Sequence, residues 1–179
     1  VWEWYNWRRE LIASKRPNPA HDAVAQMEQR FERFWLITQN VDGLHRDAGS
    51  RRLSEIHGNI WMVRCTQCRR VTENRDVPIA ILPLRSNCNG LLRPHIVWFG
   101  EVPYHLPEIE GKLRNCDVLM IIGTSGNVYP AAGFVMTAKY FGASTMAVNL
   151  DPVANSDYID EFHQGKAGEI LPKLVEQWC

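Results

Sequence analysis

The sequence predicts an α/β protein with a parallel sheet, helices on both faces of that sheet, and a small cysteine-containing insert. Residues 35–38, 118–122 and 144–149 are short, largely apolar runs without charged residues, as expected of parallel strands buried on both sides. Segments with apolar residues every three or four positions alternate with these runs, which is typical of helices that connect parallel strands. Residues 63–92 follow neither pattern and contain cysteines and prolines, so we expect the insert there.

Helical spacing of apolar residues predicts the elements around the sheet. Aromatic and aliphatic residues indicate a helix over residues 2–13, and Asn18 followed by Pro19 is a typical start for the next one. The apolar residues of this second helix recur at Ala23, Met27, Phe31 and Phe34. We expect a third helix over residues 130–140 and a C-terminal helix over residues 168–178.

Charge and composition exclude several classes of partner. The 20 basic and 20 acidic residues cancel, so no overall field attracts nucleic acid or an anionic membrane. The apolar runs are far shorter than the ~20 residues that span a bilayer, and the N-terminus does not resemble a signal peptide. We therefore expect a soluble protein. Five cysteines with one close pair suit a reducing compartment, and we expect the cytoplasm, or the mitochondrion if a preceding segment carries a transit peptide.

Polar residues directly follow each predicted strand. They are Gln39, Asn40 and Asp42 with Val41 between them, then Gly123, Thr124 and Ser125, and finally Asn149, Leu150 and Asp151. Because parallel sheets bind ligands at the carboxyl ends of their strands, these clusters could converge on one ligand. A glycine followed by two hydroxyl groups allows close backbone approach to a ribose or phosphate. The alternative is conformational, since such residues are common in turns and Asn or Asp there can simply form an Asx-turn.

Cys65 and Cys68 have the spacing of a zinc knuckle, because two intervening residues let both thiolates reach one tetrahedral ion. A second pair is expected ~15–20 residues further on, and only Cys88 lies there. We take Cys65, Cys68 and Cys88 as the candidate metal ligands.

Three motifs in order along the chain resemble one family. They are Ile37-Thr38-Gln39-Asn40-Val41-Asp42-Gly43-Leu44-His45, then Glu55-Ile56-His57-Gly58, and then the Cys65 and Cys68 pair. This series resembles the sirtuins, the NAD-dependent protein-lysine deacylases. Residues 91–101 and 123–132 resemble the same family, so the resemblance covers nearly all of the chain.

The resemblance implies a Rossmann-like NAD-binding domain, residues 1–62 and 93–179, interrupted by a zinc-ribbon-type module at residues 63–92. It also implies that the family's first strand and its glycine-rich loop, which cradles the NAD diphosphate, are not among these residues. The expected reaction removes acyl groups from the lysines of peptides or proteins and yields nicotinamide and O-acyl-ADP-ribose. The alternative is a truncated module that binds acyl-lysine peptide without turnover. A nucleic-acid-binding zinc ribbon is disfavoured by the zero net charge.

The same resemblance assigns roles to individual residues. Gln39, Asn40, Val41 and Asp42 correspond to the nicotinamide pocket, residues 123–125 to ribose and phosphate contacts, residues 149–151 to the adenosine half, and Ala167 to a position near the adenine. His57 corresponds to the general base that deprotonates a ribose hydroxyl. A histidine pKa near ~6.5 leaves the ring largely neutral and able to accept a proton. No other histidine has comparable sequence support as the general base. These others are His21, His45, His95, His105 and His163.

A segment after the insert is expected to hold the acylated lysine. Its residues are Val97, Trp98, Phe99, Gly100 and Glu101. They are extended in character and resemble the family segment that lines the acyl-lysine channel, where a peptide can pair by strand addition. The alternative is a plain core strand with Trp98 and Phe99 buried.

Tyr5 and Arg8 indicate the class of acyl group. At positions i and i+3 of a helix they share a face, so a phenol and a guanidinium can address one carboxylate. They resemble the pair that binds the acyl carboxylate in class III sirtuins, which remove succinyl, malonyl and glutaryl groups. The alternatives are that the aromatic residues simply pack while Arg8 is solvated, or that Arg9 takes the role.

The metal site departs from the family pattern. In the family a cysteine precedes the position of Cys88 by three residues, and here that position is Arg85, which cannot bind a metal. Either zinc is held by three thiolates and a borrowed ligand, or the site has decayed and packing holds the insert. We expect zinc with a structural role.

Overall fold

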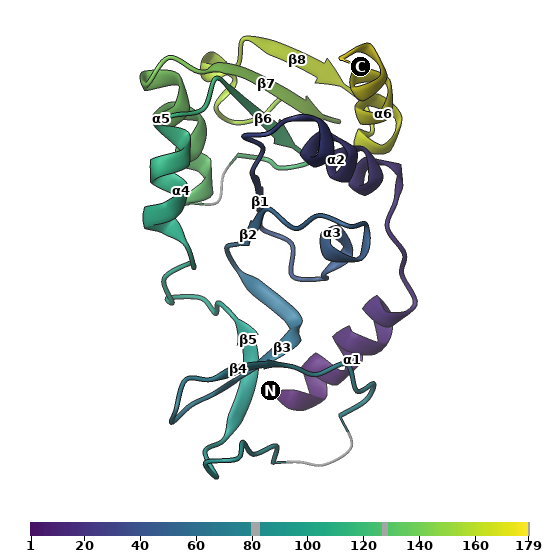
Figure 1. Ribbon diagram of the computed structural model, residues 1–179, viewed down its shortest axis with the longest axis vertical. Coiled ribbons are helices and arrows are strands. Elements are labelled where there is room, and N and C mark those ends of the chain that lie inside the picture. Colours follow the sequence, from purple (N-terminus) through teal and green to yellow (C-terminus); the bar gives the residue numbers. More distant parts are fainter. Residues whose placement is uncertain (80–82, 127–128, 179) are drawn as a thin grey trace.

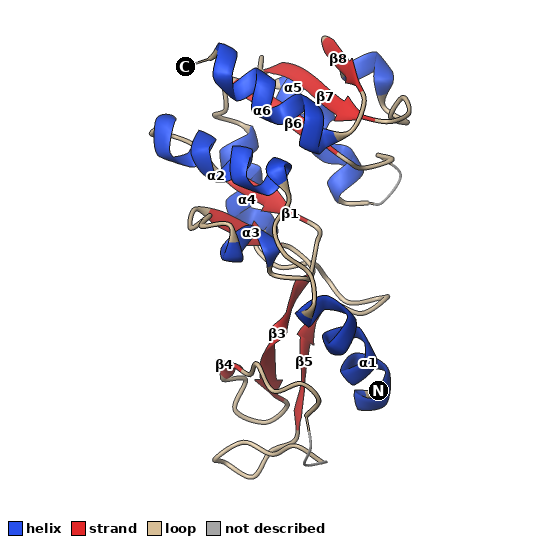
Figure 2. Cartoon of the chain, turned by 90° about the vertical axis from the view of Figure 1, so that its right-hand side faces the viewer, coloured by secondary structure: helices blue, strands red, loops and turns tan. Residues whose placement is uncertain are grey.

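The computed structural model describes residues 1–79, 83–126 and 129–178. The molecule is elongated, with a parallel sheet and several helices at one end and an antiparallel sheet with the N-terminal helix at the other (Figures 1 and 2). Some predicted segments include positions outside the described residues: 80–82 of the insert, Asn127 and Val128 of the 123–132 motif, and Cys179. Among the helices described, none combines the length and apolar character needed to cross a membrane.

The parallel strands lie in two groups. One group is a sheet in the order β6-β7-β8, formed by β6 (Val118–Ile122), β7 (Ser144–Asn149) and β8 (Glu161–Gln164). The other group is β1 (Leu36–Thr38) paired in parallel with β2 (Leu53–Glu55). The prediction of parallel strands from the apolar runs is confirmed.

β1 and β6 are not paired with each other, but the side chains of both strands pack against the same two hydrophobic clusters. Leu36, Met120 and Ile122 pack against one hydrophobic cluster. Ile37 and Leu119 pack against a second cluster. Because alternate residues of a strand point to opposite faces, this pattern places both strands in one layer with their faces aligned.

Helices cover both faces of this layer, as predicted (Figure 2). α2 (Pro19–Arg30) and α6 (Ala167–Gln177) pack together on one face, around Leu171. α4 (Leu106–Leu113) and α5 (Phe134–Tyr140) pack on the other face. The α/β class with helices on both sides of a parallel layer is therefore confirmed.

Several boundaries differ from the predictions. α1 (Trp2–Ala13) spans the predicted range, but α2 ends before Phe31, whose backbone is extended, so Phe34 lies beyond the helix. The helix predicted at 130–140 opens with the 3₁₀ turn η1 (Ala131–Gly133) before α5. Short elements without a clear apolar period were not predicted: α3 (Leu44–Asp47), β2, α4, η2 (Ser156–Tyr158) and β8.

The other end of the molecule is an antiparallel sheet in the order β4-β3-β5, formed by β3 (Gly58–Cys65), β4 (Val71–Glu73) and β5 (Leu92–Ile96). α1 packs against it through Tyr5, which joins Ile60 and Ile96 in one hydrophobic cluster. Gly58 has a φ of +85°, and a Cβ there would lie 1.9 Å from the carbonyl oxygen of His95. Only glycine therefore permits this close approach of β5.

Candidate functional site

A cavity of about 1800 Å³ lies between β1 and β6 and reaches the carboxyl ends of both strands. Predicted site residues that follow two distant strands meet there, together with the first residue of α6. We call this part the polar end, lined by Gln39, Asn40, Gly123, Thr124, Ser125 and Ala167. The other predicted nucleotide contacts, Val41, Asp42, Asn149, Leu150 and Asp151, lie beside these residues in sequence but outside the cavity lining.

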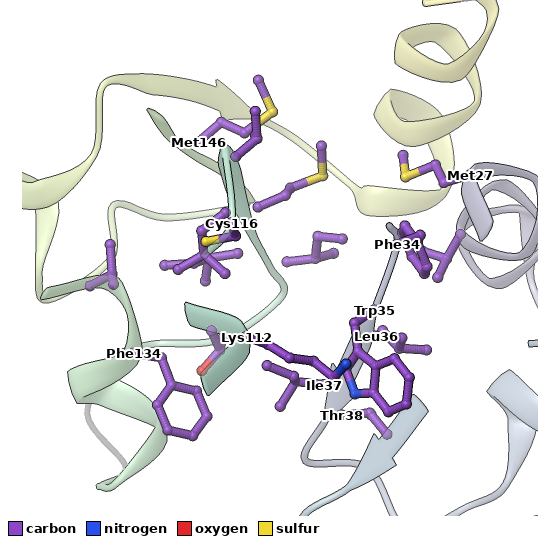
Figure 3. A pocket seen from close by; sticks show the side chains of 18 of the residues that line it. Met27, Phe34, Trp35, Leu36, Ile37, Thr38, Lys112, Cys116, Phe134 and Met146 are labelled. Atoms are coloured by element: carbon purple, nitrogen blue, oxygen red, sulfur yellow. The ribbon is translucent and has the colours of Figure 1, made fainter. Parts of the chain in front are cut away.

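Another part of the cavity is largely apolar. We call it the apolar gap, lined by Leu36, Ile37, Leu119, Met120, Ile121, Phe134 and Met146. Figure 3 shows side chains of β1 on one side and Phe134 and Met146 on the other, with Lys112 extended towards the ring of Trp35. Small-molecule sites usually measure about 300–1000 Å³. A cofactor at the polar end would therefore leave the apolar gap unfilled.

The loops after β6 and β7 are tied together by hydrogen bonds. The N–H of Gly123 donates to the carbonyl oxygen of Val148 (3.0 Å), and Asn149 Nδ2 donates to the carbonyl oxygen of Thr124 (3.0 Å). Leu150 and Asp151, which follow, are exposed. The Asn149 side chain thus positions the loop that contains Thr124, and Leu150 and Asp151 are accessible to a ligand.

Asp42 forms an Asx-turn, which on sequence alone was the alternative to a ligand contact. Its Oδ1 accepts the N–H of Leu44 (2.9 Å) at the start of α3, and its carbonyl oxygen accepts the indole N–H of Trp61 (2.7 Å). Within the described residues Oδ2 makes no hydrogen bond, so the turn and a ligand contact are compatible. Gly43 has a φ of +81°, and a Cβ there would lie 2.9 Å from the Trp61 ring.

His57 lies between β2 and β3, half-buried, next to the polar end. Its Nδ1 is 3.2 Å from the carbonyl oxygen of Gln39. Its own carbonyl oxygen accepts the N–H of Val97 (2.9 Å). One residue is therefore in contact with both the 39–42 cluster and the 97–101 segment.

Two histidines not assigned a role from the sequence, His21 and His45, also line the cavity, with ring centroids 4.6 Å apart. Burial lowers the pKa of His45 to about 4, with the neighbouring His21 as the next cause. Burial likewise lowers the pKa of His21. Both rings are therefore neutral at neutral pH. The position of His45 at the end of the 37–45 motif was the signal that could have identified it.

The expectation that residues 97–101 are extended is wrong. They follow β5 as a turn, in which the N–H of Glu101 donates to the carbonyl oxygen of Trp98 (2.9 Å). Arg93 binds both carboxylate oxygens of Glu101 (2.6 and 2.9 Å) and lies 3.5 Å from the centroid of the Trp98 ring. Hydrogen bonding from Arg93 lowers the pKa of Glu101 to about 2. Trp98 and Phe99 are both exposed, so the alternative of a buried core strand is wrong.

Tyr5 connects α1 to this turn. It is buried, and its hydroxyl oxygen accepts the indole N–H of Trp98 (2.8 Å). Arg8 is half-buried, and its guanidinium lies 5.5 Å from the ring centroid of Trp4 and 5.9 Å from that of Trp7. None of the ion pairs in the described residues involves Arg8.

Arg9, the alternative to Arg8 for binding an acyl carboxylate, has a structural role instead. It is 1% exposed and donates to the carbonyl oxygens of Ile60 (3.0 Å), Asp76 (3.2 Å) and Asn74. Burial lowers the pKa of its guanidinium. Its donors are therefore engaged by the antiparallel end of the chain.

The three candidate metal ligands converge. The sulfur atoms of Cys65, Cys68 and Cys88 lie within 4.8 Å of one another, and Cys65 Sγ is 3.4 Å from Cys88 Sγ. The N–H groups of Gln67 and Cys68 each donate to Cys65 Sγ (3.4 Å). Hydrogen bonding from the Ser86 hydroxyl is the main cause that lowers the pKa of Cys65 to about 6. Clustered thiolates of this kind fit a structural zinc ion.

Comparison with known proteins gives a consistent result. Residues 1–130 match the model of the Sir2 family. The "NAD-dependent protein deacylase 2" of Pyrobaculum aerophilum is 47% identical over 180 residues, which cover 99% of this chain and 72% of that protein. The "NAD-dependent protein deacylase" of Leptospira interrogans is 44% identical over 184 residues, covering 99% of this chain and 74% of that protein.

Solved structures agree. A crystal structure of a Sir2 homologue in complex with NAD matches with a TM-score of 0.91 and 39% identity, covering 98% of this chain and 70% of that one. A Sir2 protein bound to acetylated peptide matches with a TM-score of 0.87 and 29% identity, covering 99% and 78%. The similarity therefore includes both ends of the molecule.

Proposed function

Because this chain belongs to the Sir2 family and is an NAD-dependent protein-lysine deacylase, we propose that its preferred substrates are lysines that carry acidic acyl groups: succinyl, malonyl or glutaryl. The observation that supports this is the Tyr5 hydroxyl bound to Trp98, with Arg8 one turn further along the same helix. The alternative of a non-catalytic module is not favoured, because relatives that align with 99% of this chain are named deacylases.

Tyr5 and Arg8 offer complementary donors for a carboxylate. The Tyr5 oxygen already accepts the N–H of Trp98, so its own O–H proton is available to an acceptor. The planar guanidinium of Arg8, held over Trp4 and Trp7, presents paired N–H donors that match a carboxylate. An acetyl group has no carboxylate, so it gains nothing from this pair.

We propose that NAD binds at the polar end of the cavity. That end presents main-chain, hydroxyl and amide groups of neutral charge, which suit ribose and phosphate oxygens. Bound NAD supplies the bond between nicotinamide and ribose whose cleavage drives acyl transfer. The residues proposed to hold it are Gln39, Asn40, Val41, Asp42, Gly123, Thr124, Ser125, Asn149, Leu150, Asp151 and Ala167.

His57 is proposed as the general base, acting through Nε2. A carbonyl oxygen can only accept a hydrogen bond, so the contact with the Gln39 carbonyl requires that Nδ1 carries the proton. In the neutral ring with this tautomer, Nε2 is the nitrogen without a proton, which can accept one from a ribose hydroxyl. Gln39 thereby sets the tautomer of the base through its main chain.

The acylated peptide is proposed to bind along residues 97–101. This turn adjoins the proposed base, since the N–H of Val97 donates to the carbonyl oxygen of His57. The contacts of Arg93 with Glu101 and Trp98 hold the turn in place. The similarity to a Sir2 protein bound to acetylated peptide supports this choice of partner.

We propose that a β-strand outside the 179 residues fills the apolar gap. β1 and β6 each have one paired neighbour in the described structure, and their faces are aligned across the gap. A strand between them would bond to both edges and bury the apolar side chains. A glycine-rich loop after that strand would end at the polar end. Residues 1–62 and 93–179 would then form the NAD-binding domain, and residues 63–92 the zinc module.

The proposed compartment is the cytoplasm. Cys65, Cys68, Cys88 and Cys116 are free thiols. A reducing compartment preserves thiols in this state, and zinc binding at three of them requires that they are reduced.

The substrate proposal is tested with two peptides of one sequence that carry succinyl-lysine or acetyl-lysine. The double variant Tyr5→Phe, Arg8→Met should lose at least about tenfold of kcat/KM on the succinyl peptide and little on the acetyl peptide, because two hydrogen bonds to a charged group are removed. The matched control is Arg16→Met, an exposed arginine beyond the end of α1. Equal losses on both peptides would refute the acidic preference. Isothermal titration with NAD tests cofactor binding separately.

A further inference from the structure

The thiolate cluster has three protein ligands where zinc prefers a tetrahedral set. In the described residues no fourth Cys, His, Asp or Glu joins Cys65, Cys68 and Cys88. Arg85, at the position where the resemblance expects a cysteine, is exposed and donates through Nη1 to the carbonyl oxygen of Asn89 (2.7 Å). Its side chain therefore stabilises the loop outside the cluster.

The Ser86 hydroxyl is the polar group that contacts two of the sulfurs. Ser86 Oγ is 3.1 Å from Cys65 Sγ and 3.0 Å from Cys88 Sγ. In a tetrahedral site, Zn–S distances of about 2.3 Å and Zn–O distances of about 2.0 Å place oxygen about 3.5 Å from each sulfur. The observed separations are a few tenths of an ångström shorter, so a small expansion would admit the ion. Ser86 Oγ therefore lies close to where a fourth ligand belongs.

The backbone holds Ser86 in this place. Its N–H donates to the carbonyl oxygen of Gly90 (2.9 Å), and its carbonyl oxygen accepts the N–H of Asn89 (2.9 Å). Gly90 packs so closely that a Cβ there would lie 2.6 Å from Cys65 Sγ. The loop that contains Cys88 is thus closed against Cys65, with the serine hydroxyl directed at the sulfurs.

We propose that Ser86 supplies the fourth zinc ligand through its hydroxyl oxygen, and that the resulting site of three thiolates and one hydroxyl exchanges its metal readily. Zinc favours thiolate over a neutral hydroxyl, so this site holds the ion less tightly than a site of four thiolates. Cys68 and Cys88 are exposed, which gives a competing chelator access to the ion. The inference deepens the expected zinc binding and is independent of the proposed acyl preference.

Cobalt substitution tests the ligand set. In Co²⁺-loaded protein, the sulfur-to-metal charge-transfer absorption reports the number of bound thiolates. Ser86→Cys should raise this absorption by about one third, as three thiolates become four, and should slow the transfer of zinc to EDTA about tenfold or more. Ser14→Cys is the matched control, because Ser14 is an exposed serine at the end of α1, and it should keep the three-thiolate spectrum.

A second variant tests the proposal by removing the proposed ligand instead of adding a stronger one. Ser86→Ala should speed zinc transfer to EDTA about tenfold, the usual effect of a lost partner at a metal site. The proposal is overturned if wild-type protein binds no zinc, if Ser86→Ala releases zinc at the wild-type rate, or if Ser86→Cys keeps the three-thiolate spectrum. These readouts do not involve acyl transfer, so failure here leaves the proposed function standing and the reverse also holds.

Discussion

The polar end of the cavity and the thiolate cluster are built in opposite ways. At the polar end, backbone elements far apart in sequence bring the side chains together, and His57 depends on the main chain of Gln39 for its tautomer. At the thiolate cluster, two short turns supply all the ligands through local N–H and hydroxyl contacts. Catalytic activity should therefore be sensitive to changes in how the strands are arranged. Metal binding should be sensitive to the loss of single side chains. Substitutions at one site should leave the other intact.

The largest expected effect is on catalysis. His57→Ala should lower kcat on any acyl-lysine peptide by about 10²–10⁴-fold, the range for loss of a general base. Zinc content should be unchanged, because His57 is remote from the cysteines in the fold. His163→Ala, on β8, is the control and should retain activity. Retention of wild-type kcat by His57→Ala would show that another group accepts the proton.

The next largest effect is on stability. Cys65→Ala should abolish zinc binding and lower the free energy of unfolding by about 4 kcal/mol, since loss of a metal is among the largest single-residue effects. Thermal unfolding with and without zinc measures this. At a temperature where the variant remains folded, kcat should stay within a few fold of wild type. A loss of kcat comparable to that of His57→Ala would contradict the separation of the two sites.

A smaller effect is expected where α1 contacts the turn after β5. Trp98→Phe removes the hydrogen bond to Tyr5, so the phenol loses its fixed orientation. We expect a drop of about fivefold in kcat/KM on the succinyl peptide, equivalent to about 1 kcal/mol for one hydrogen bond. Tyr5→Phe should produce a similar drop, and the double variant should be no worse than either alone. Additive losses would mean that Trp98 acts on the substrate directly.

The smallest effect concerns pH. Arg93 lowers the pKa of Glu101 from 4.5 to about 2, so the folded turn favours the charged carboxylate. The stabilisation is present above the unfolded pKa near 4.5 and disappears as the pH falls towards 2. Trp98 fluorescence should therefore change between these values in wild type. In Glu101→Gln the transition should be absent, and its persistence would assign it to another group.

Features encoded by local pattern were predictable from the sequence. The uncharged run at 118–122 predicted a parallel strand, and the spacing of Cys65 and Cys68 predicted a metal ligand pair. The expected burial of that strand is wrong for the described structure, because β6 borders the cavity and its residues are exposed or only partly buried. α1 was predicted to its exact bounds because its aromatic residues recur at helical spacing.

Features that depend on distant contacts were not predictable. The bond between Trp98 and Tyr5 joins residues 93 positions apart, and no local pattern records it. Ser86 lies 21 positions from Cys65, and serine is too common in turns to indicate a metal ligand. The sequence also could not decide whether Arg8 or the adjacent Arg9 is available to bind an acyl carboxylate. Only packing showed that Arg9 is buried against carbonyl groups at the antiparallel end.

Among the described residues, β1 and β6 each have one unpaired strand edge, and these edges affect colloidal behaviour. Residues of β6 are apolar, partly β-branched, and without charge or proline, which is the composition of segments that assemble into intermolecular sheets. An exposed strand edge of this kind is a template for pairing with other chains. If the 179 residues are prepared by themselves, without a strand in the apolar gap, they should self-associate as their concentration rises. The groove that would receive a strand within the molecule is thus also a surface at which copies without that strand can pair.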